Sequence, residues 1–134
     1  ITPCPILLKG KHIWQVLEEA LLPEFIYRPI RGFGFRGKVL GTICLDGLQV
    51  EFDPSREDYH KIMRVWVNGS PLGLNRTYSV GTLDMFTFGI GYTSLSQGKD
   101  VAYFLPEFIR DVLVQQLTDP EEIQKSKTAR WIKV

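Results

Sequence analysis

The chain contains few of the residues that carry metal or covalent chemistry. Its 134 residues include only two histidines and two cysteines. His12 and His60 stand far apart, and neither has a companion at a spacing typical of metal ligands. Cys4 and Cys44 are too few for a disulfide framework, so we expect buried thiols inside strands, with a bridge between them as the alternative. Because no nucleophile and base pair or metal cluster stands out, the sequence argues against a self-sufficient enzyme.

The sequence also lacks an excess of one charge and any long apolar run. Its 16 basic and 15 acidic residues leave a net charge of +1, which favours no particular class of partner. No apolar segment approaches the roughly 20 residues of a membrane-spanning helix. The length suits one domain with a single core. The sequence starts at Ile1 without a signal-peptide pattern, so we expect it to be a part of a longer protein.

In the first third of the chain, the apolar pattern predicts a strand followed by a helix. Residues 5–9 form a short apolar run, and Gly10 separates it from residues 11–22, where apolar side chains recur every three or four positions. This spacing predicts an amphipathic helix that turns Glu18 and Glu19 toward water and ends at Pro23. Residues 24–38 contain three glycines, and Pro23 just before them and Pro29 within them favour two turns, which indicates a long loop or a ragged hairpin.

The middle of the chain is typical of antiparallel strands joined by turns. Apolar and polar residues alternate over residues 48–52, an Asp-Pro-Ser turn follows, and residues 60–67 are the expected partner strand. Asn68-Gly69 predicts a tight turn, because both residues tolerate a positive φ. A second turn at Asn75-Arg76 precedes residues 77–82, where Tyr78 and Val80 alternate with small polar residues as in another strand.

The last third predicts two helices and a closing strand. Residues 106–117 begin with a proline, which a first helical turn tolerates, and should form a helix. Asp119 is followed by Pro120 and two glutamates, the pattern of a capped helix start. Residues 131–134 predict a strand whose Trp131 covers the core. The inner face of the first of these helices is expected to carry Phe108, Ile109, Val112, Leu113 and Leu117.

One basic stretch raises the alternative of RNA binding. Residues 31–35, R-G-F-G-F, copy the start of the RNA-recognition-motif octapeptide, in which aromatic side chains stack on bases. The octapeptide continues with an apolar sixth and an aromatic eighth residue, whereas Arg36 and Lys38 occupy those positions here. A glycine-flexible basic loop is the simpler interpretation, in which Arg28, Arg31, Arg36 and Lys38 are solvated.

Two adjoining motifs carry a family resemblance. Residues 67–72 read V-N-G-S-P-L, residues 75–82 read N-R-T-Y-S-V-G-T, and a glycine-rich turn then closes on Tyr92. This order resembles the C-terminal domain of the bacterial 5'-nucleotidase / UDP-sugar hydrolase family. Residues 6–22, residues 48–55 and Arg130-Trp131 resemble it more faintly. The resemblance implies an α+β fold with mixed, mostly antiparallel sheets and flanking helices, layered α/β/β/α, with residues 1–134 as a single, N-terminally incomplete domain.

The resemblance also implies a role in nucleotide catabolism. In that family this domain holds the nucleotide, and a separate N-terminal metallophosphoesterase domain with two divalent metal ions hydrolyses it. We therefore expect no catalytic residue, metal or cofactor in this chain. The expected partners are a nucleotide or related phosphoester substrate and the metallophosphoesterase domain of the same protein, with no membrane or nucleic acid. Family members are often exported or held at the cell surface. A degenerate structural or interaction domain is the alternative function.

The segment after the strand at residues 77–82 is the candidate ligand site. In the family the turn reads G-G-D-G-Y, its Asp bonds the nucleoside, and an aromatic residue shortly before it stacks on the base. Here Ile90 occupies the position of that Asp, and the aromatic position falls on Met85 or Phe86. As an alternative, the two Phe rings fill the core beneath the loop. The substrate-binding residues implied are Asp84, Met85, Phe86, Phe88, Gly89, Ile90, Gly91 and Tyr92.

Overall fold

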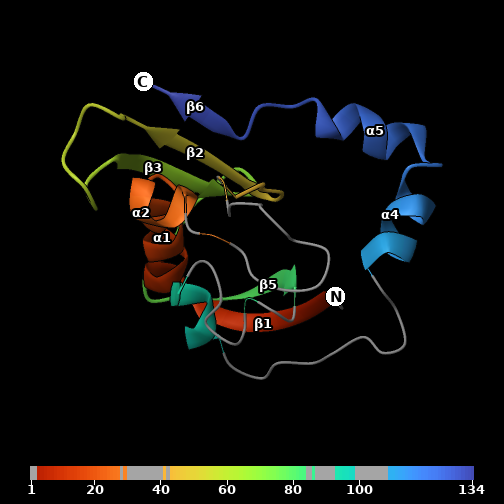
Figure 1. Ribbon diagram of the computed structural model, residues 1–134, viewed down its shortest axis with the longest axis horizontal. Helices are drawn as coiled ribbons and strands as arrows, with labels where there is room; N and C mark the ends of the chain where they lie inside the picture. Colours follow the sequence, from red (N-terminus) through yellow and green to blue (C-terminus); the bar gives the residue numbers. More distant parts are fainter. Residues whose placement is uncertain are drawn as a thin grey trace.

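The fold contains two separate sheets that are joined at one end by a helix (Figure 1). The computed structural model describes residues 3–27, 29, 41, 43–83, 86, 93–98 and 109–134. In the smaller sheet, β1 (Pro3–Lys9) pairs antiparallel with β5 (Thr77–Leu83). Ile6 and Val80 are opposite each other in this pairing. The two strands that the apolar and alternating patterns predicted therefore lie side by side, although about 70 residues separate them in the sequence.

The larger sheet has four strands in the order β4-β3-β2-β6. β2 (Leu48–Phe52) pairs antiparallel with β3 (Ile62–Val67) and parallel with β6 (Trp131–Lys133), while β4 (Ser70–Pro71) forms the other edge. Asn68 and Gly69 have φ values of 49° and 85°, which is the backbone of the predicted tight turn between β3 and β4. The mixed, mostly antiparallel α+β architecture is confirmed.

The core forms where α1 (Gly10–Glu19) packs against both sheets. The start of α1 lies at the end of β1, and its last turn reaches β3 (Figure 1). A short helix, α2 (Pro23–Ile26), follows α1, so Pro23 is the first residue of a new helix and the loop predicted for residues 24–38 is wrong at its beginning. The buried core cluster consists of Ile6, Leu8, Ile13, Val16, Leu17, Ala20, Val50, Ile62, Val65 and Leu95.

Glu18 and Glu19 are buried, which corrects the prediction that they face water. Their residues are only 2% and 3% exposed. The Glu18 carboxylate accepts hydrogen bonds from the backbone N–H groups of Lys61 and Ile62, at 3.1 and 2.9 Å. The Glu19 carboxylate accepts one from Ser94 at 2.9 Å, at the start of η1 (Thr93–Gln97). Because these bonds replace water, the last turn of α1 accommodates two buried carboxylates.

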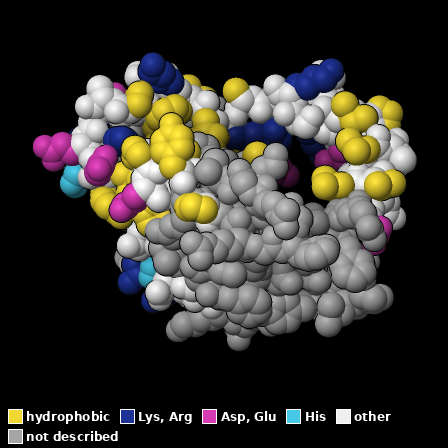
Figure 2. Space-filling model, viewed as in Figure 1, with side chains coloured by type: hydrophobic (Ala, Val, Ile, Leu, Met, Phe, Trp, Pro, Cys, Tyr) yellow, Lys and Arg dark blue, Asp and Glu magenta, His cyan; other side chains and the backbone are white. Residues whose placement is uncertain are grey.

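The two C-terminal helices project from the side of the fold (Figure 1). α5 (Pro120–Ser126) starts as predicted, because the Asp119 carboxylate accepts a hydrogen bond from the Glu121 N–H. α4 (Ile109–Gln116) does not pack as predicted: Leu113 is 54% exposed, and Leu117, in the turn directly after the helix, is 64% exposed. Apolar side chains accordingly show on this part of the surface (Figure 2). An amphipathic pattern results in burial only where another element covers the face, and none of the described elements covers this one.

The closing strand covers the core as predicted. Trp131 of β6 is half-buried against the core cluster, and its ring meets Phe52 edge-on at a centroid distance of 5.7 Å. The Trp131 indole N–H donates to the carbonyl oxygen of Ile43 at 3.0 Å. This hydrogen bond attaches the segment before β2 to the parallel edge of the sheet.

The hydrogen bonds in the turn after β2 should make the stability of the fold depend on pH. The Asp53 carboxylate accepts hydrogen bonds from the hydroxyl and the N–H group of Ser55, at 2.6 and 3.0 Å, and chiefly the hydroxyl bond lowers the pKa of Asp53. Since the pKa is lowered in the folded state, the stabilisation exists above the pKa of an unfolded Asp and is lost as the pH falls through the lowered value. Ser55→Ala should raise the Asp53 pKa in an NMR titration, whereas Ser70→Ala, at an exposed position, should not. An unchanged pKa in Ser55→Ala would contradict the assigned cause.

Candidate ligand-binding site

β5 leads directly into the segment predicted to bind ligand. Tyr78 and Val80 are half-buried toward the core, while Ser79 and Gly81 are exposed, as the alternation predicted. Of the predicted substrate-binding residues the structure describes Phe86, which is half-buried and packs against the core cluster. The other predicted residues lie outside the described part of the chain: Asp84, Met85, Phe88, Gly89, Ile90, Gly91 and Tyr92.

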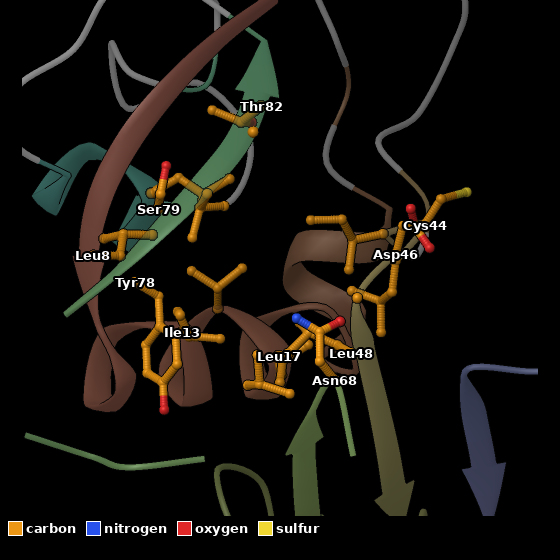
Figure 3. Close-up of a pocket in the computed structure, with 18 residues that line it drawn as sticks. Leu8, Ile13, Leu17, Cys44, Asp46, Leu48, Asn68, Tyr78, Ser79 and Thr82 are labelled. Carbon is orange, nitrogen blue, oxygen red and sulfur yellow. The ribbon is translucent and has the colours of Figure 1, made fainter. Parts of the chain in front are cut away.

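A cavity of about 240 Å³ lies between the two sheets and extends along β5 to Thr82 (Figure 3). Its floor is apolar: Leu8 of β1 and Ile13 and Leu17 of α1 contribute to it. Leu48 at the start of β2 lies on the side opposite Tyr78 (Figure 3). Because strands from both sheets and a helix form its walls, the cavity depends on how the sheets are packed and not on any one segment.

Polar groups from sequence-distant segments surround this apolar floor. Cys44 and Asp46 line the cavity from the segment before β2, and Asn68 lines it from the turn after β3. Ser79 and Thr82 line it from β5. Hydroxyl, amide and carboxylate groups are the donors and acceptors that orient a ligand over an apolar surface. The arrangement is suited to holding a small, mostly apolar group with a few polar substituents.

The charges and hydrogen bonds around the cavity are mostly satisfied within the protein. Asp46 pairs with Arg130 at 3.1 Å, and its side chain is 88% exposed, so this surface pair adds at most about 1 kcal/mol of stability. The hydroxyl of Tyr78 accepts a hydrogen bond from the Gly73 N–H at 2.8 Å. The guanidinium of Arg76 lies 5.7 Å from the centre of the Tyr78 ring. These contacts hold Tyr78 and Asp46 in place at the cavity wall.

The residues that could carry other chemistry are dispersed. His12 is on α1 and His60 is exposed in the β2–β3 connection, and within the described ranges no three His, Cys, Asp or Glu residues gather as metal ligands. Cys4 is buried in β1 as predicted, whereas Cys44 is exposed and outside any strand, so that expectation is wrong for Cys44. It precedes β2 in a connecting segment that follows the surface. The basic stretch at residues 31–38 and Arg28 lie outside the described residues.

Several cavity residues had no recognisable signal in the sequence. Asn68 was identified only as a turn residue and Cys44 only as a small apolar residue, because local patterns report the backbone and not which segments meet.

Among the helices that the structure describes, none has the length and apolar character needed to cross a membrane.

Comparison with known proteins identifies the family. The sequence model described as "5'-nucleotidase, C-terminal domain" matches residues 4–97. The Bacillus subtilis (strain 168) protein named "Uncharacterized metallophosphoesterase YunD" is 32% identical over 117 residues, which cover 87% of this chain and 25% of that protein. The chain therefore spans about a quarter of the length of this relative.

Solved structures show the same fold. A putative 5'-nucleotidase from Staphylococcus aureus, solved in complex with α-ketoglutarate, superposes with a TM-score of 0.71 over 98% of this chain and 27% of its own, at 12% identity. A 5'-nucleotidase precursor from Thermus thermophilus superposes with a TM-score of 0.56 over 77% of this chain and 19% of its own, at 27% identity. The chain belongs to the family of 5'-nucleotidase C-terminal domains.

Proposed function

We propose that this domain recognises the nucleoside part of a nucleotide or related phosphoester, which a linked metallophosphoesterase domain hydrolyses. The observation that carries the proposal is the family membership over residues 4–97, together with a relative named as a metallophosphoesterase that is about four times as long as the matched segment. On this proposal the chain's residues bind and orient the substrate. The two divalent metal ions expected in the other domain supply the charge stabilisation that phosphoester cleavage requires.

The cavity beside β5 supports a recognition role. Drug-sized ligands occupy pockets of roughly 300–1,000 Å³, so a cavity of about 240 Å³ suits a base-sized group and not a complete nucleotide. Thr82 and Ser79 line it from β5, and the predicted substrate-binding residues start directly after this strand. Phe86 packs against the same core cluster that forms the cavity floor. A base bound at this end of β5 would be adjacent to the predicted loop.

A degenerate interaction domain is the second candidate, and Ile90 is the observation that favours it. An isoleucine accepts no hydrogen bond, and a site that lacks one polar partner discriminates much less between ligands. Isothermal calorimetry of the full-length protein with a panel of nucleotides and nucleosides distinguishes nucleoside recognition from a degenerate interaction domain. Heat of binding from at least one nucleoside supports recognition, and no heat from any supports the degenerate domain.

Substitutions in the predicted loop test recognition directly. Stacking of a base on an aromatic ring contributes about 1–3 kcal/mol, so Phe88→Ala in the full-length enzyme should raise KM for its nucleotide substrate about ten-fold, with the melting temperature nearly unchanged. Ile90→Asp should lower KM, because it restores a hydrogen-bond acceptor. Steady-state phosphate release and thermal unfolding are the measurements.

The control separates loss of stacking from loss of stability. Phe52→Leu alters a ring that packs on Trp131 in the larger sheet, so it should lower the melting temperature and leave KM unchanged. Phe86 is half-buried, and Phe86→Ala should affect both quantities. If Phe88→Ala lowers the melting temperature and does not change KM, the loop belongs to the core and the recognition role is refuted.

A further inference from the structure

A second hollow, of about 300 Å³, follows the outer side of α1. Lys11, Trp14, Gln15 and Glu18 line it at the three- and four-residue spacing that places side chains on one face of a helix. Two other segments close the hollow: Leu74 near the start of α1, where the Lys11 N–H donates to the Leu74 carbonyl, and Tyr59 from the β2–β3 connection. Two large aromatic side chains therefore border one accessible space.

Tyr59 is held in an unfavourable backbone conformation. Its φ is 65°, in the left-handed region that bulky side chains seldom adopt, and the other described non-glycine residue there is Asn68, in a tight turn. Tyr59 is 48% exposed, so packing of its ring offsets only part of this strain. Strain of this kind persists mostly where the position of a side chain serves a function. Here it holds a ring beside the hollow.

One exposed carboxylate lies at the Tyr59 end of the hollow: the Tyr59 hydroxyl is 3.5 Å from the Glu24 carboxylate. Glu18 also lines the hollow, but its carboxylate is buried and accepts hydrogen bonds from the backbone N–H groups of Lys61 and Ile62. Burial raises the pKa of Tyr59, and the negative charges of Glu24, Glu19 and Asp58 raise it further. Carboxylates also gather over the β2–β3 connection at the left edge of the surface (Figure 2).

The basic residues nearby leave this negative region in place. The Lys61 ammonium is 3.4 Å from the Asp58 carboxylate, so these two charges offset each other and the pair adds little net charge. Lys11 lies seven residues before Glu18 on α1, which is roughly 10 Å along the helix axis at about 1.5 Å per residue. The opposite ends of the hollow therefore differ in charge, with Lys11 at the Leu74 end and Glu24 beside Tyr59 at the other.

We propose that the hollow between Trp14 and Tyr59 binds an organic cation, an alkylammonium or guanidinium group, with its charge directed toward the exposed carboxylate of Glu24 beside the Tyr59 hydroxyl. Aromatic faces attract such cations through the ring quadrupole, and a neighbouring carboxylate adds a second attraction. The strained backbone of Tyr59 keeps one of these faces in position before the ligand arrives, which reduces the cost of ordering the site.

Two cations and their neutral counterparts test the charge requirement. Tetramethylammonium and methylguanidinium chlorides, added at millimolar concentration and constant ionic strength, should shift the NMR signal of the Trp14 indole N–H saturably. tert-Butanol and methylurea have nearly the same shapes without the charge and should not. Equal shifts from the neutral compounds, or no shift from the cations, would overturn the proposal.

Variants separate a binding residue from a packing residue. Tyr59→Gly removes the ring and relieves the strained backbone, so it should abolish cation binding with the melting temperature unchanged or higher. Tyr59→Phe keeps the ring and should bind within about two-fold of the wild type. Tyr27→Ala, which removes a tyrosine that is 70% exposed and does not line the hollow, is the matched control and should bind normally.

The results for Tyr59→Gly and Glu24→Gln decide between a cation site and simple packing. If Tyr59→Gly still binds the cations, the proposed site is refuted. If Tyr59→Gly lowers the melting temperature as well as binding, Glu24→Gln decides, because Glu24 is exposed and its loss leaves the fold intact. An affinity for tetramethylammonium reduced about three-fold in Glu24→Gln supports the cation site, and an unchanged affinity overturns it.

Discussion

Replacing Gly10 with alanine is expected to destabilise the domain by about 3 kcal/mol, because no space exists for the added methyl group. A Cβ atom at Gly10 would lie 2.0 Å from the Gly73 carbonyl oxygen and 2.8 Å from its carbon, both of them backbone atoms. The close approach comes from two hydrogen bonds, from the Gly10 N–H to Arg76 at 2.8 Å and from the Lys11 N–H to Leu74 at 2.9 Å. The methyl group would push these segments apart.

The expected loss exceeds the gain that alanine normally brings to a helix. Gly→Ala inside a helix stabilises by about 1 kcal/mol, and Gly10 is the first residue of α1, where the gain is smaller. Urea denaturation provides the measurement. Gly81→Ala is the control, because a Cβ there meets nothing within 4 Å, and its midpoint should change little. Equal stability of the Gly10→Ala variant and the wild type would show that the contact with Gly73 relaxes easily.

Glu18→Ala should cost about 3 kcal/mol of unfolding free energy, because it leaves two backbone N–H groups without their charged acceptor. The Ile62 N–H is buried, and the Lys61 N–H is partly buried, where β3 begins. A buried donor without a partner costs roughly 1–3 kcal/mol, and water has little access to replace a side chain that is 2% exposed. The substitution should weaken chiefly the contact between the end of α1 and the start of β3, where both hydrogen bonds are lost.

Glu18→Gln distinguishes the charge from the packing. Glutamine fills nearly the same volume and retains one acceptor oxygen, so we expect it to lose about half as much stability as alanine. Glu57→Ala, an exposed carboxylate in the β2–β3 connection, is the matched control and should change stability by less than about 0.5 kcal/mol. Hydrogen exchange of the Ile62 N–H gives a second measurement, because this group should exchange faster once the Glu18 carboxylate is gone. An unchanged exchange rate in Glu18→Ala would contradict the role of Glu18 as its acceptor.

Strands and turns could be predicted from the sequence, because their signals are local. The alternation of Tyr78 and Val80 with polar residues follows from the period of a strand with one covered face. Asn68-Gly69 predicted its turn because few other residues adopt two successive positive φ values. Asp119-Pro120 predicted a helix start, since the capping hydrogen bond involves residues two positions apart.

Burial could not be predicted wherever it depends on a distant partner. Glu18 and Glu19 have the charge of solvated residues, and they are buried because backbone donors more than 40 positions away reach them. Leu113 and Leu117 have the spacing of a covered helix face, yet more than half of each is exposed. The positive φ of Tyr59 also has no signal in its residue type, because tyrosine disfavours it.

The sequence by itself therefore determined the family and the α+β class, since these depend on motifs whose residues lie close together. Only the tertiary structure decided which residues form the cavity beside β5 and the Trp14–Tyr59 hollow. Each space is bounded by segments from different parts of the chain, and their meeting depends on how two sheets pack around α1. Packing of this kind is set by the sum of many distant contacts, which no local pattern reports.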